Sequence, residues 1–381
     1  LSGEFAIGRL ARTGTIGSYE YCFARRGRKK LGAALSWIPL LGSLGIAIGY
    51  AVILGWVLRS LAGSVTGELL TADVEAFFHQ ASGSFGSVPW HVAIVVLVGL
   101  VLMFGVTKGI EKVSKVLMPL FFGLFLILAV WVAFLPGAAE GYKFLFVPEW
   151  RALLRVDTWV MAMGQAFFSL SITGSGMIVY GAYLSPQEDV VGVAQHTALF
   201  DTIAAVVAAL VIIPACFSYG LDVGAGPSLL FVTLPTILQD IPLGQLFAVI
   251  LYIAMIFAGV SSLQNMFEAV AESLQHRFPR LSRTATLIIL AVLCLGFGIG
   301  METISQWGPW MDLVSIYIIP IGATLGAVSW FYVMKKDELL SAINTGSGKT
   351  RGRLWYGIGR YLYVPLAVIL CCVALFMKVA F

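Results

Sequence analysis

Long apolar runs, separated by short polar connections, set the pattern of the whole chain. A helix needs roughly 20 mostly apolar residues to cross the hydrocarbon of a bilayer, and nine runs reach or approach that length. The runs are continuous and lack the alternation of an outer-membrane barrel, so they predict membrane helices. The predicted spans are residues 35–59, 91–106, 116–135, 159–183, 191–217, 246–270, 285–300, 310–334 and 361–381.

The composition leads to the same fold class. Of the 381 residues, 59% are hydrophobic and 12% are charged, and the mean hydropathy is +0.92. A soluble domain carries about 25% charged residues, so a soluble fold is excluded. The sequence predicts an all-α polytopic membrane protein with a single transmembrane domain over residues 1–381.

Basic residues are concentrated in alternate connections. Lys and Arg are dense in residues 9–30, 108–115, 277–283, 335–336 and 349–360. Residues 61–90 and 222–244 contain acids but no Lys or Arg. Because cytoplasmic loops hold the excess of Lys and Arg, we assign the first set to the inside and the second to the outside. The charges are spread over membrane-flanking loops, so nucleic-acid binding is not expected.

Two further stretches have unusual patterns. Residues 224–244 are too apolar for ordinary exposure, yet Pro227 and Pro235 interrupt them too often for a span. We expect an outer re-entrant or vestibule-packed hairpin there. Residues 1–8 are apolar and run directly into the basic cluster from Arg9, so they look like the end of a helix that begins upstream.

The span 159–183 carries small and hydroxyl residues near its middle. Gly174 and Gly176 weaken the helix there, and nearby hydroxyls can bond the backbone groups that are freed. Irregular backbone at membrane depth persists only where it lines a cavity or is buried in protein. An opened helix offers carbonyls to a cation and N–H groups to an anion, as an amino acid and a sodium ion require. Close packing of small residues is the alternative explanation.

A second helix carries a polar face. Ala258, Ser261, Ser262 and Asn265 are spaced by three, one and three residues, which places them on one side of a helix, and Glu268 continues that side. Packing alone can explain the serines. An acid in lipid is costly, so Glu268 is interpreted as functional or internally paired.

Two more acids, Asp201 and Asp312, lie within apolar spans, where they are either functional or structurally paired with a neighbouring group. The histidines are scattered and form no catalytic or metal cluster. The stretch Gly348-Lys349-Thr350 looks like the end of a phosphate-binding loop, but Ile343 stands where its first glycine is needed. We therefore expect neither an enzyme nor nucleotide binding.

Several motifs, in this order along the chain, resemble the neurotransmitter:sodium symporter family and its bacterial members. The span 159–183 is similar to the sixth membrane helix of that family. The motifs are Glu4 with Gly8 in helix two, Lys108-Gly-Ile-Glu-Lys112 after helix four, Gly164-Gln-Ala-Phe-Phe-Ser-Leu-Ser171 and Tyr180-Gly-Ala-Tyr183 in helix six, Gly224-Ala-Gly-Pro-Ser-Leu-Leu-Phe-Val-Thr-Leu-Pro235 in the fourth outer loop, and Phe257-Ala-Gly-Val-Ser-Ser262 in helix eight.

The resemblance implies a LeuT-like inverted-repeat fold, in which substrate and sodium lie between broken helices one and six. Residues 1–8 then form the end of helix two, 35–135 helices three to five, 159–334 helices six to ten, and 354–381 helix eleven. Helix one, which supplies ligands to both family sodium sites, is not among the 381 residues. We expect both sodium sites to be incomplete here and transport to require that helix.

The resemblance also implies site residues. Ser169 with Asp201 corresponds to the first sodium site, and Ala258, Ser261 and Ser262 correspond to the second. Asp201 stands where relatives often have Asn, and its charge can replace that of chloride, so chloride is not expected as a co-ion. The implied substrate-binding residues are Ile46, Tyr50, Phe168, Ser169, Ser171, Gly174, Ser262 and Met266.

Gly174 replaces a bulky residue of leucine-selective relatives, so we expect a large apolar or aromatic amino acid as substrate. Gln165 with Asp312 resembles the outer gate and Tyr183 part of the inner gate, while His276 stands near the position of the family's inner-gate acid. The expected function is sodium-coupled amino-acid symport in a bacterial inner membrane. An amino-acid sensor of transporter-like fold and an ion channel are the alternatives.

Overall fold

The computed structural model describes residues 1–104, 107–224 and 226–377, and of residues 107–114 and 117 it describes the backbone alone. Within this part of the chain the regular structure is entirely helical, which confirms the predicted fold class. The helices are α1 Ser2–Ala11, α2 Thr15–Ala24, α3 Lys29–Leu35, α4 Trp37–Thr66, α5 Glu68–Thr71, α6 Val74–Ala81, α7 Val88–Phe104, α8 Thr107–Ala133, α9 Ala138–Phe146, α10 Val156–Ser169, α11 Gly176–Tyr183, α12 Val190–Tyr219, α13 Leu234–Asp240, α14 Gly244–Arg277, α15 Arg283–Gly298, α16 Ile304–Asp312, α17 Ile319–Val328, α18 Lys336–Asn344, α19 Arg353–Ile358 and α20 Val364–Met377.

Most predicted spans each fall on a single helical run, and several of these runs extend further than predicted. Helices α4 and α14 each continue about two turns past the predicted ends at residues 59 and 270. The predicted span 159–183 falls on two helices, α10 and α11. Six helical runs in the described residues are long and apolar enough to cross a membrane: Lys29–Thr66, Val190–Tyr219, Gly244–Arg277, Arg283–Met301, Ile304–Val333 and Arg353–Phe376.

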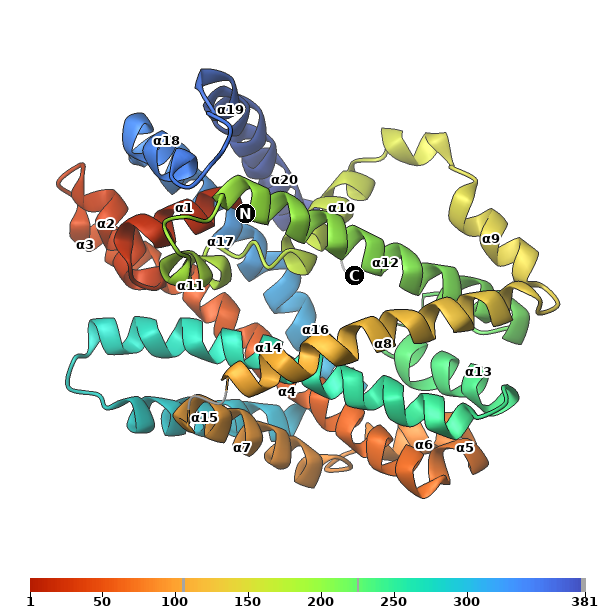
Figure 1. The fold of residues 1–381 in the computed structure, drawn as a ribbon. Helices are drawn as coiled ribbons and strands as arrows, with labels where there is room; N and C mark the ends of the chain where they lie inside the picture. Colours follow the sequence, from red (N-terminus) through yellow and green to blue (C-terminus); the bar gives the residue numbers. More distant parts are fainter. Residues whose placement is uncertain (105–106, 225, 378–381) are drawn as a thin grey trace.

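The long helices form a packed array. Helices α12, α8, α14, α15 and α7 follow one another as neighbours across the molecule, and α4 packs along α14 (Figure 1). The core of this array is centred on Trp56 of α4, which is fully buried and meets the rings of Phe78, Phe231 and Trp307. These rings come from the outer connections and from α16, so the outer segments are fixed to the array by apolar burial.

Helix α1 lies directly against α11, with backbone touching backbone. A Cβ on Gly8 would overlap the carbonyl oxygen of Ile178, and one on Gly181 would overlap that of Phe5. Small residues allow this approach between helices in a membrane. The motif residue Gly8 therefore has a packing role: it brings α1 against the second half of the broken span.

Two arginines, one in the last turn of α1 and one at its C-cap, secure the same contact on the inner side. The Arg9 guanidinium is buried and donates to the carbonyl oxygens of Thr345, Ser185 and Glu188 at 2.8 to 3.0 Å. Arg12 donates to the carbonyl oxygens of Ala182 and Leu184 at 3.1 and 3.2 Å, where α11 ends. Carbonyls at a helix end lack intrahelical partners, so these bonds cap α11 and join it to the α18 segment.

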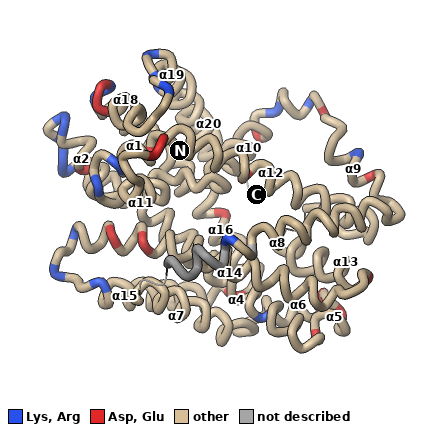
Figure 2. The backbone as a smooth tube through the Cα atoms, in the orientation of Figure 1, with Lys and Arg blue, Asp and Glu red and all other residues tan. Residues whose placement is uncertain are grey.

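The distribution of charge follows the predicted orientation with one exception. Lys and Arg gather around α2, the start of α15, α18 and α19, whereas the end that carries α5, α6 and α13 has few (Figure 2). The exception is the connection that contains α9, which holds Lys143, Arg151 and Arg155. The side chains of the predicted inner cluster at Lys108 and Lys112 lie outside the described residues.

The outer connection 224–244 forms helical turns that pack on the array. Leu229–Thr233 leads into α13, and Leu234, Ile237 and Leu238 are fully buried against α14 and the end of α12. Pro235 lies in the first turn of α13, where a missing N–H costs no hydrogen bond. The proline therefore starts the helix instead of breaking it.

The α1–α11 contact generates a stability prediction. Gly8→Ala should lower the free energy of unfolding by about 1–3 kcal/mol, because the new methyl group must displace the α11 backbone. Gly99→Ala on α7 is the matched control, since nothing lies within 4 Å of its added Cβ, and it should be neutral or stabilising. Denaturant or thermal unfolding in detergent measures both. Equal effects of the two substitutions would contradict the backbone contact.

Candidate functional site

The predicted break in the span 159–183 is present in the structure. Helix α10 ends at Ser169 and α11 begins at Gly176. Between them the chain takes the left-handed backbone conformation twice, at Ser171 with φ 52° and at Gly174 with φ 74°. A non-glycine residue in that region is uncommon and is maintained only by its surroundings. The sequence feature that suggested the break, clustered glycine and serine, therefore marks a true interruption.

The backbone groups freed at the break are bonded inside the protein. The N–H of Gly174 donates to Glu4 Oε1 at 2.7 Å, and that of Gly176 donates to Thr173 Oγ1 at 3.1 Å. Ile172 N–H donates to the carbonyl of Phe167 at 2.8 Å. This explains how irregular backbone persists at membrane depth. It also shows that Glu4, the other motif residue of α1, accepts a hydrogen bond from the broken segment, a role that the sequence had not suggested.

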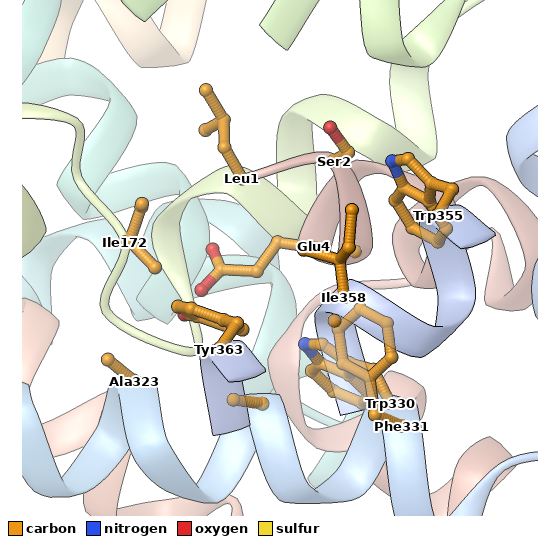
Figure 3. A pocket seen from close by; sticks show the side chains of 13 residues that line it. Leu1, Ser2, Glu4, Ile172, Ala323, Trp330, Phe331, Trp355, Ile358 and Tyr363 are labelled. Atoms are coloured by element: carbon orange, nitrogen blue, oxygen red, sulfur yellow. The ribbon is translucent and has the colours of Figure 1, made fainter. Parts of the chain in front are cut away.

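Glu4 lies beside a separate aromatic cavity of about 230 Å³ (Figure 3). Its side chain is 3% exposed, and Oε2 has no hydrogen-bond partner among the described residues. Trp330, Phe331 and Tyr363 line the same cavity. The hydrogen bond from Gly174 to the Glu4 carboxylate thus joins the broken segment to α1 beside this cavity.

A second cavity, of about 260 Å³, opens at the break itself. Its walls are α4, the end of α10, the interrupted segment, α11 and α14. Seven of the eight predicted substrate-binding residues line it: Ile46, Tyr50, Phe168, Ser169, Ser171, Ser262 and Met266. Hydroxyl groups come from α4, the end of α10, the interrupted segment and α14, and apolar side chains come from α4, α10 and α14, so the cavity can bind an amphipathic solute.

The eighth residue, Gly174, does not line this cavity. A Cβ on Gly174 would overlap the carbonyl oxygen of Gly322 and approach the hydroxyl of Tyr19 to 2.9 Å. A side chain at position 174 would therefore point at α17 and α2, and Gly174 is not among the residues that line the cavity. The expectation that a missing side chain at Gly174 enlarges the substrate pocket is wrong in this structure.

The two residues of the predicted first sodium site are in contact. Ser169 Oγ lies 2.7 Å from each carboxylate oxygen of Asp201 and donates its single proton to that carboxylate, which joins the end of α10 to α12. A carboxylate and a hydroxyl are hard oxygen ligands of the kind that alkali and alkaline-earth cations take. The chemistry of the two residues therefore fits a sodium ion as cargo. The same contact also agrees with the second interpretation of Asp201, in which the acid is paired with a neighbouring hydroxyl for structural reasons.

The three residues of the predicted second sodium site share one stretch of α14. Ser261 Oγ donates to the carbonyl of Ala258 at 2.8 Å, and Ser262 reaches the cavity. A carbonyl oxygen has two lone pairs and a hydroxyl can accept as well as donate, so this bond leaves acceptor capacity for a cation. In the described part of the chain, no group of three or more His, Cys, Asp or Glu residues could hold a metal ion.

The predicted outer and inner gates differ in whether their residues are hydrogen-bonded. Gln165 and Asp312 make no hydrogen bond with each other in the described structure. At the inner end, Tyr183 Oη donates to Glu268 Oε1 at 3.2 Å, and Arg283 donates to the same carboxylate at 2.6 and 3.1 Å. Glu268 is thus internally paired, and it links α11 to the start of α15.

The neighbouring polar contacts on α14 involve α2. His276, near the family's inner-gate acid, lies 3.2 Å from a Glu20 oxygen and 3.5 Å from Thr13 Oγ1. Thr13 Oγ1 also donates to Glu272 Oε1 at 2.8 Å. The inner end of α14 is therefore bound to α2 and α15 by separate polar groups.

Sequence reasoning missed part of the cavity wall. Ser43 precedes Ile46 and Tyr50 by three and seven residues on α4, so helical spacing was a usable signal for it. Asn265 belongs to the polar stripe of α14 but had received no substrate role. The added lining residues are Ser43, Thr173, Gly176, Met177, Tyr180 and Asn265.

Comparison with known proteins gives consistent matches. The model of a family described as the sodium:neurotransmitter symporter family matches residues 73–380. YhdH of Bacillus subtilis, an uncharacterized sodium-dependent transporter, is 33% identical, with 97% of this chain and 84% of that protein covered. An uncharacterized sodium-dependent transporter of Haemophilus influenzae is 26% identical, with 96% and 84% covered.

A solved structure matches the fold. The crystal structure of MhsT in complex with L-phenylalanine superposes with a TM-score of 0.88 at 29% sequence identity. The match covers 98% of this chain and 87% of MhsT. The helical arrangement therefore agrees with that of MhsT along nearly the whole chain.

The Glu268–Arg283 pair generates a prediction for a double-mutant cycle. Glu268→Gln and Arg283→Gln, alone and together, should give a coupling free energy of about 1 kcal/mol, because Arg283 is 41% exposed and solvent screens the pair. Unfolding in detergent measures it. Arg25 and Glu338 form a single-contact control pair with a similarly exposed arginine. A coupling no larger than that of the control would contradict a structural link at α11.

Proposed function

The chain belongs to the sodium:neurotransmitter symporter family, and on this premise we propose that it takes up a large apolar or aromatic amino acid together with sodium. It is a sodium-dependent transporter with an inverted-repeat helical fold and not an enzyme, which confirms the resemblance seen in the sequence. Its bacterial relatives support a bacterial cell membrane as its location.

The observation that carries the proposal is the broken helix on the wall of a mixed cavity. Ser169 and Ser171 stand at the break, and the apolar side chains of Ile46 and Met266 line the same space. An amino acid has a charged end and a side chain. In this cavity the polar groups can bind the charged end and the apolar groups can contact the side chain. The structurally similar MhsT binds L-phenylalanine in its crystal structure, which supports the choice of an aromatic substrate.

In the proposed binding mode, the broken segment receives the charged end of the substrate. The carbonyls of Phe168, Ser169 and Ser171 accept hydrogen bonds from the ammonium group, and the Tyr50 hydroxyl donates to the carboxylate. The side chain then rests against Ile46 and Met266. No covalent chemistry is needed, because transport requires only that these bonds form on one side and break on the other.

Sodium is the proposed second cargo, at two sites. Ser169 and Asp201 contribute a hydroxyl and a carboxylate to the first, and Ala258, Ser261 and Ser262 contribute carbonyl and hydroxyl oxygens to the second. Because Ser169 belongs to both the first sodium site and the substrate cavity, a sodium ion there orders a residue that the substrate contacts. Such a shared residue makes the two cargoes bind cooperatively.

Alternating access supplies the transport cycle. Inverted-repeat transporters bind at the membrane midplane and rock one helix bundle against the other. In this chain Gln165 and Asp312 are the proposed outer gate, and Tyr183 with Glu268 is the proposed inner gate. Release of the Tyr183–Glu268 bond would free the inner end of α11 from α14 and open the cavity to the cytoplasm.

Accumulation in liposomes tests the function. The complete protein should concentrate radiolabelled L-phenylalanine above equilibrium only under an inward sodium gradient, because the gradient supplies the work. Replacing chloride with gluconate should leave the rate unchanged, since Asp201 provides the negative charge. Flux that only dissipates a gradient would indicate a channel, and binding without flux would indicate a sensor, so either outcome would contradict symport.

Asp201→Asn is the matched variant for the sodium site. It keeps the size and hydrogen-bonding capacity of the side chain but removes its charge, so the sodium concentration for half-maximal uptake should rise about tenfold, equivalent to roughly 1.4 kcal/mol. Chloride should partly restore uptake by this variant. Unchanged sodium dependence would refute a role for Asp201 in ion binding.

Cavity size is tested at Met266. Met266→Trp should lower uptake of L-phenylalanine and L-tryptophan by at least about tenfold, while L-alanine, which needs less space, is still transported. Met103→Trp on α7 is the control, because that side chain is 41% exposed on the outside of the array. Loss of all three amino acids in equal proportion would show that Met266 does not select by size.

A further inference from the structure

A basic groove lies at the inner end of the molecule, away from the substrate cavity. It has a volume of about 560 Å³ and is formed by α3, the first residue of α4, α2 and the last residue of α14. Its cationic residues are Lys29, Lys30 and Arg277, and all three are exposed. Figure 1 shows α2, α3 and the inner end of α14 at the same end of the array.

The inner ends of two long helical runs border this groove. The run Lys29–Thr66 has 38 residues and Gly244–Arg277 has 34, which correspond to about 57 and 51 Å of helix. The hydrocarbon is about 30 Å thick, so both helices must extend beyond it. Lys29 and Arg277 are the inner ends of these runs and lie six and seven residues beyond the predicted spans 35–59 and 246–270, or about 9 to 11 Å of helix. The groove between them is therefore at the inner membrane surface, within reach of the lipid headgroups.

Two of the cations in the groove are available for an external anion. Glu20 lies 3.3 Å from Lys29 Nζ and 3.2 Å from His276, so its charge is already used. Neither Lys30 nor Arg277 has an ion pair with a carboxylate among the described residues. With three cations and one acid lining it, the groove carries a net charge of about +2 before the histidine is counted.

The remaining walls suit a lipid better than a soluble anion. Ala33, Ala34 and the half-buried Trp37 form the apolar part of the groove lining. Tryptophan is enriched at the membrane interface, where its ring sits among headgroups. Phosphate binding above an apolar wall is the arrangement that the headgroup and first acyl carbons of a phospholipid require.

We propose that this groove binds the headgroup of an anionic phospholipid from the cytoplasmic leaflet. The phosphate lies between Lys30 and Arg277, and the glycerol and upper acyl chain lie against Trp37. The bound lipid bridges the inner ends of α4 and α14, two helices that pack along each other and both line the substrate cavity. The site is independent of substrate and sodium.

Lipid binding to the purified complete protein tests the proposal. Native mass spectrometry or titration in detergent should show phosphatidylglycerol binding more tightly than phosphatidylcholine with the same chains. Lys30→Gln with Arg277→Gln should weaken phosphatidylglycerol binding about thirtyfold, since each cation near a membrane surface contributes about 1 kcal/mol. Lys30→Arg with Arg277→Lys keeps both charges and should retain the preference.

The control variant removes the same charge from another place on the inner side. Lys335→Gln with Arg353→Gln should bind phosphatidylglycerol as the unchanged protein does, because both side chains are exposed outside the groove. If phosphatidylglycerol binding weakened equally in both variants, the cause would be general surface charge, and the proposal would be overturned. Competition by millimolar inorganic phosphate alone would also overturn it, since the site would then bind a free anion.

Discussion

The structure depends on one constraint: a helix that is interrupted inside a bilayer must find partners for its free backbone groups within the protein. Water cannot serve them there. Glu4 of α1 accepts from the N–H of Gly174, and α1 can reach that position because Gly8 allows backbone contact with α11. The packing of α1, the break and the cavity are therefore parts of one arrangement, and a change in any of them affects the others.

The same constraint produces the binding surface. An interrupted helix exposes backbone N–H and C=O groups that are hydrogen-bonded within a regular helix. The interruption lies between α4, α12 and α14, which add a phenol, a carboxylate and hydroxyls. Ser169 connects the two halves of the site, since it lines the cavity and bonds Asp201 of α12. On the inner side, Tyr183 donates to Glu268, so α11, which begins at the break, is also joined to α14.

The sequence predicted those features that depend on local pattern. Apolar runs located the helices, and clustered Gly and Ser located the break, because both signals are contained in neighbouring residues. Family resemblance added Tyr50 and Met266, which line the cavity as expected. The predicted role of Gly174 in the substrate pocket was wrong because the backbone there, with φ 74°, directs an added Cβ toward Gly322. The direction in which a residue faces in irregular backbone cannot be read from its residue type.

Long-range pairs were the other limit of sequence reasoning. Glu268 was expected to be functional or paired, but its partner Arg283 belongs to another helix, and no spacing rule joins them. The same holds for Glu4, whose acceptor role depends on how closely α1 packs against α11. Such contacts come from tertiary packing, which brings together groups far apart in the chain.

Hydrogen exchange across residues 168–176 of the complete protein tests the central claim most directly, because it reports on the broken segment itself. Sodium with L-phenylalanine should slow exchange of these amides more than either does alone, since the proposed sites place both cargoes on this segment. If exchange there is unchanged while substrate binding is shown by another method, the site lies elsewhere and the broken helix has only a packing role.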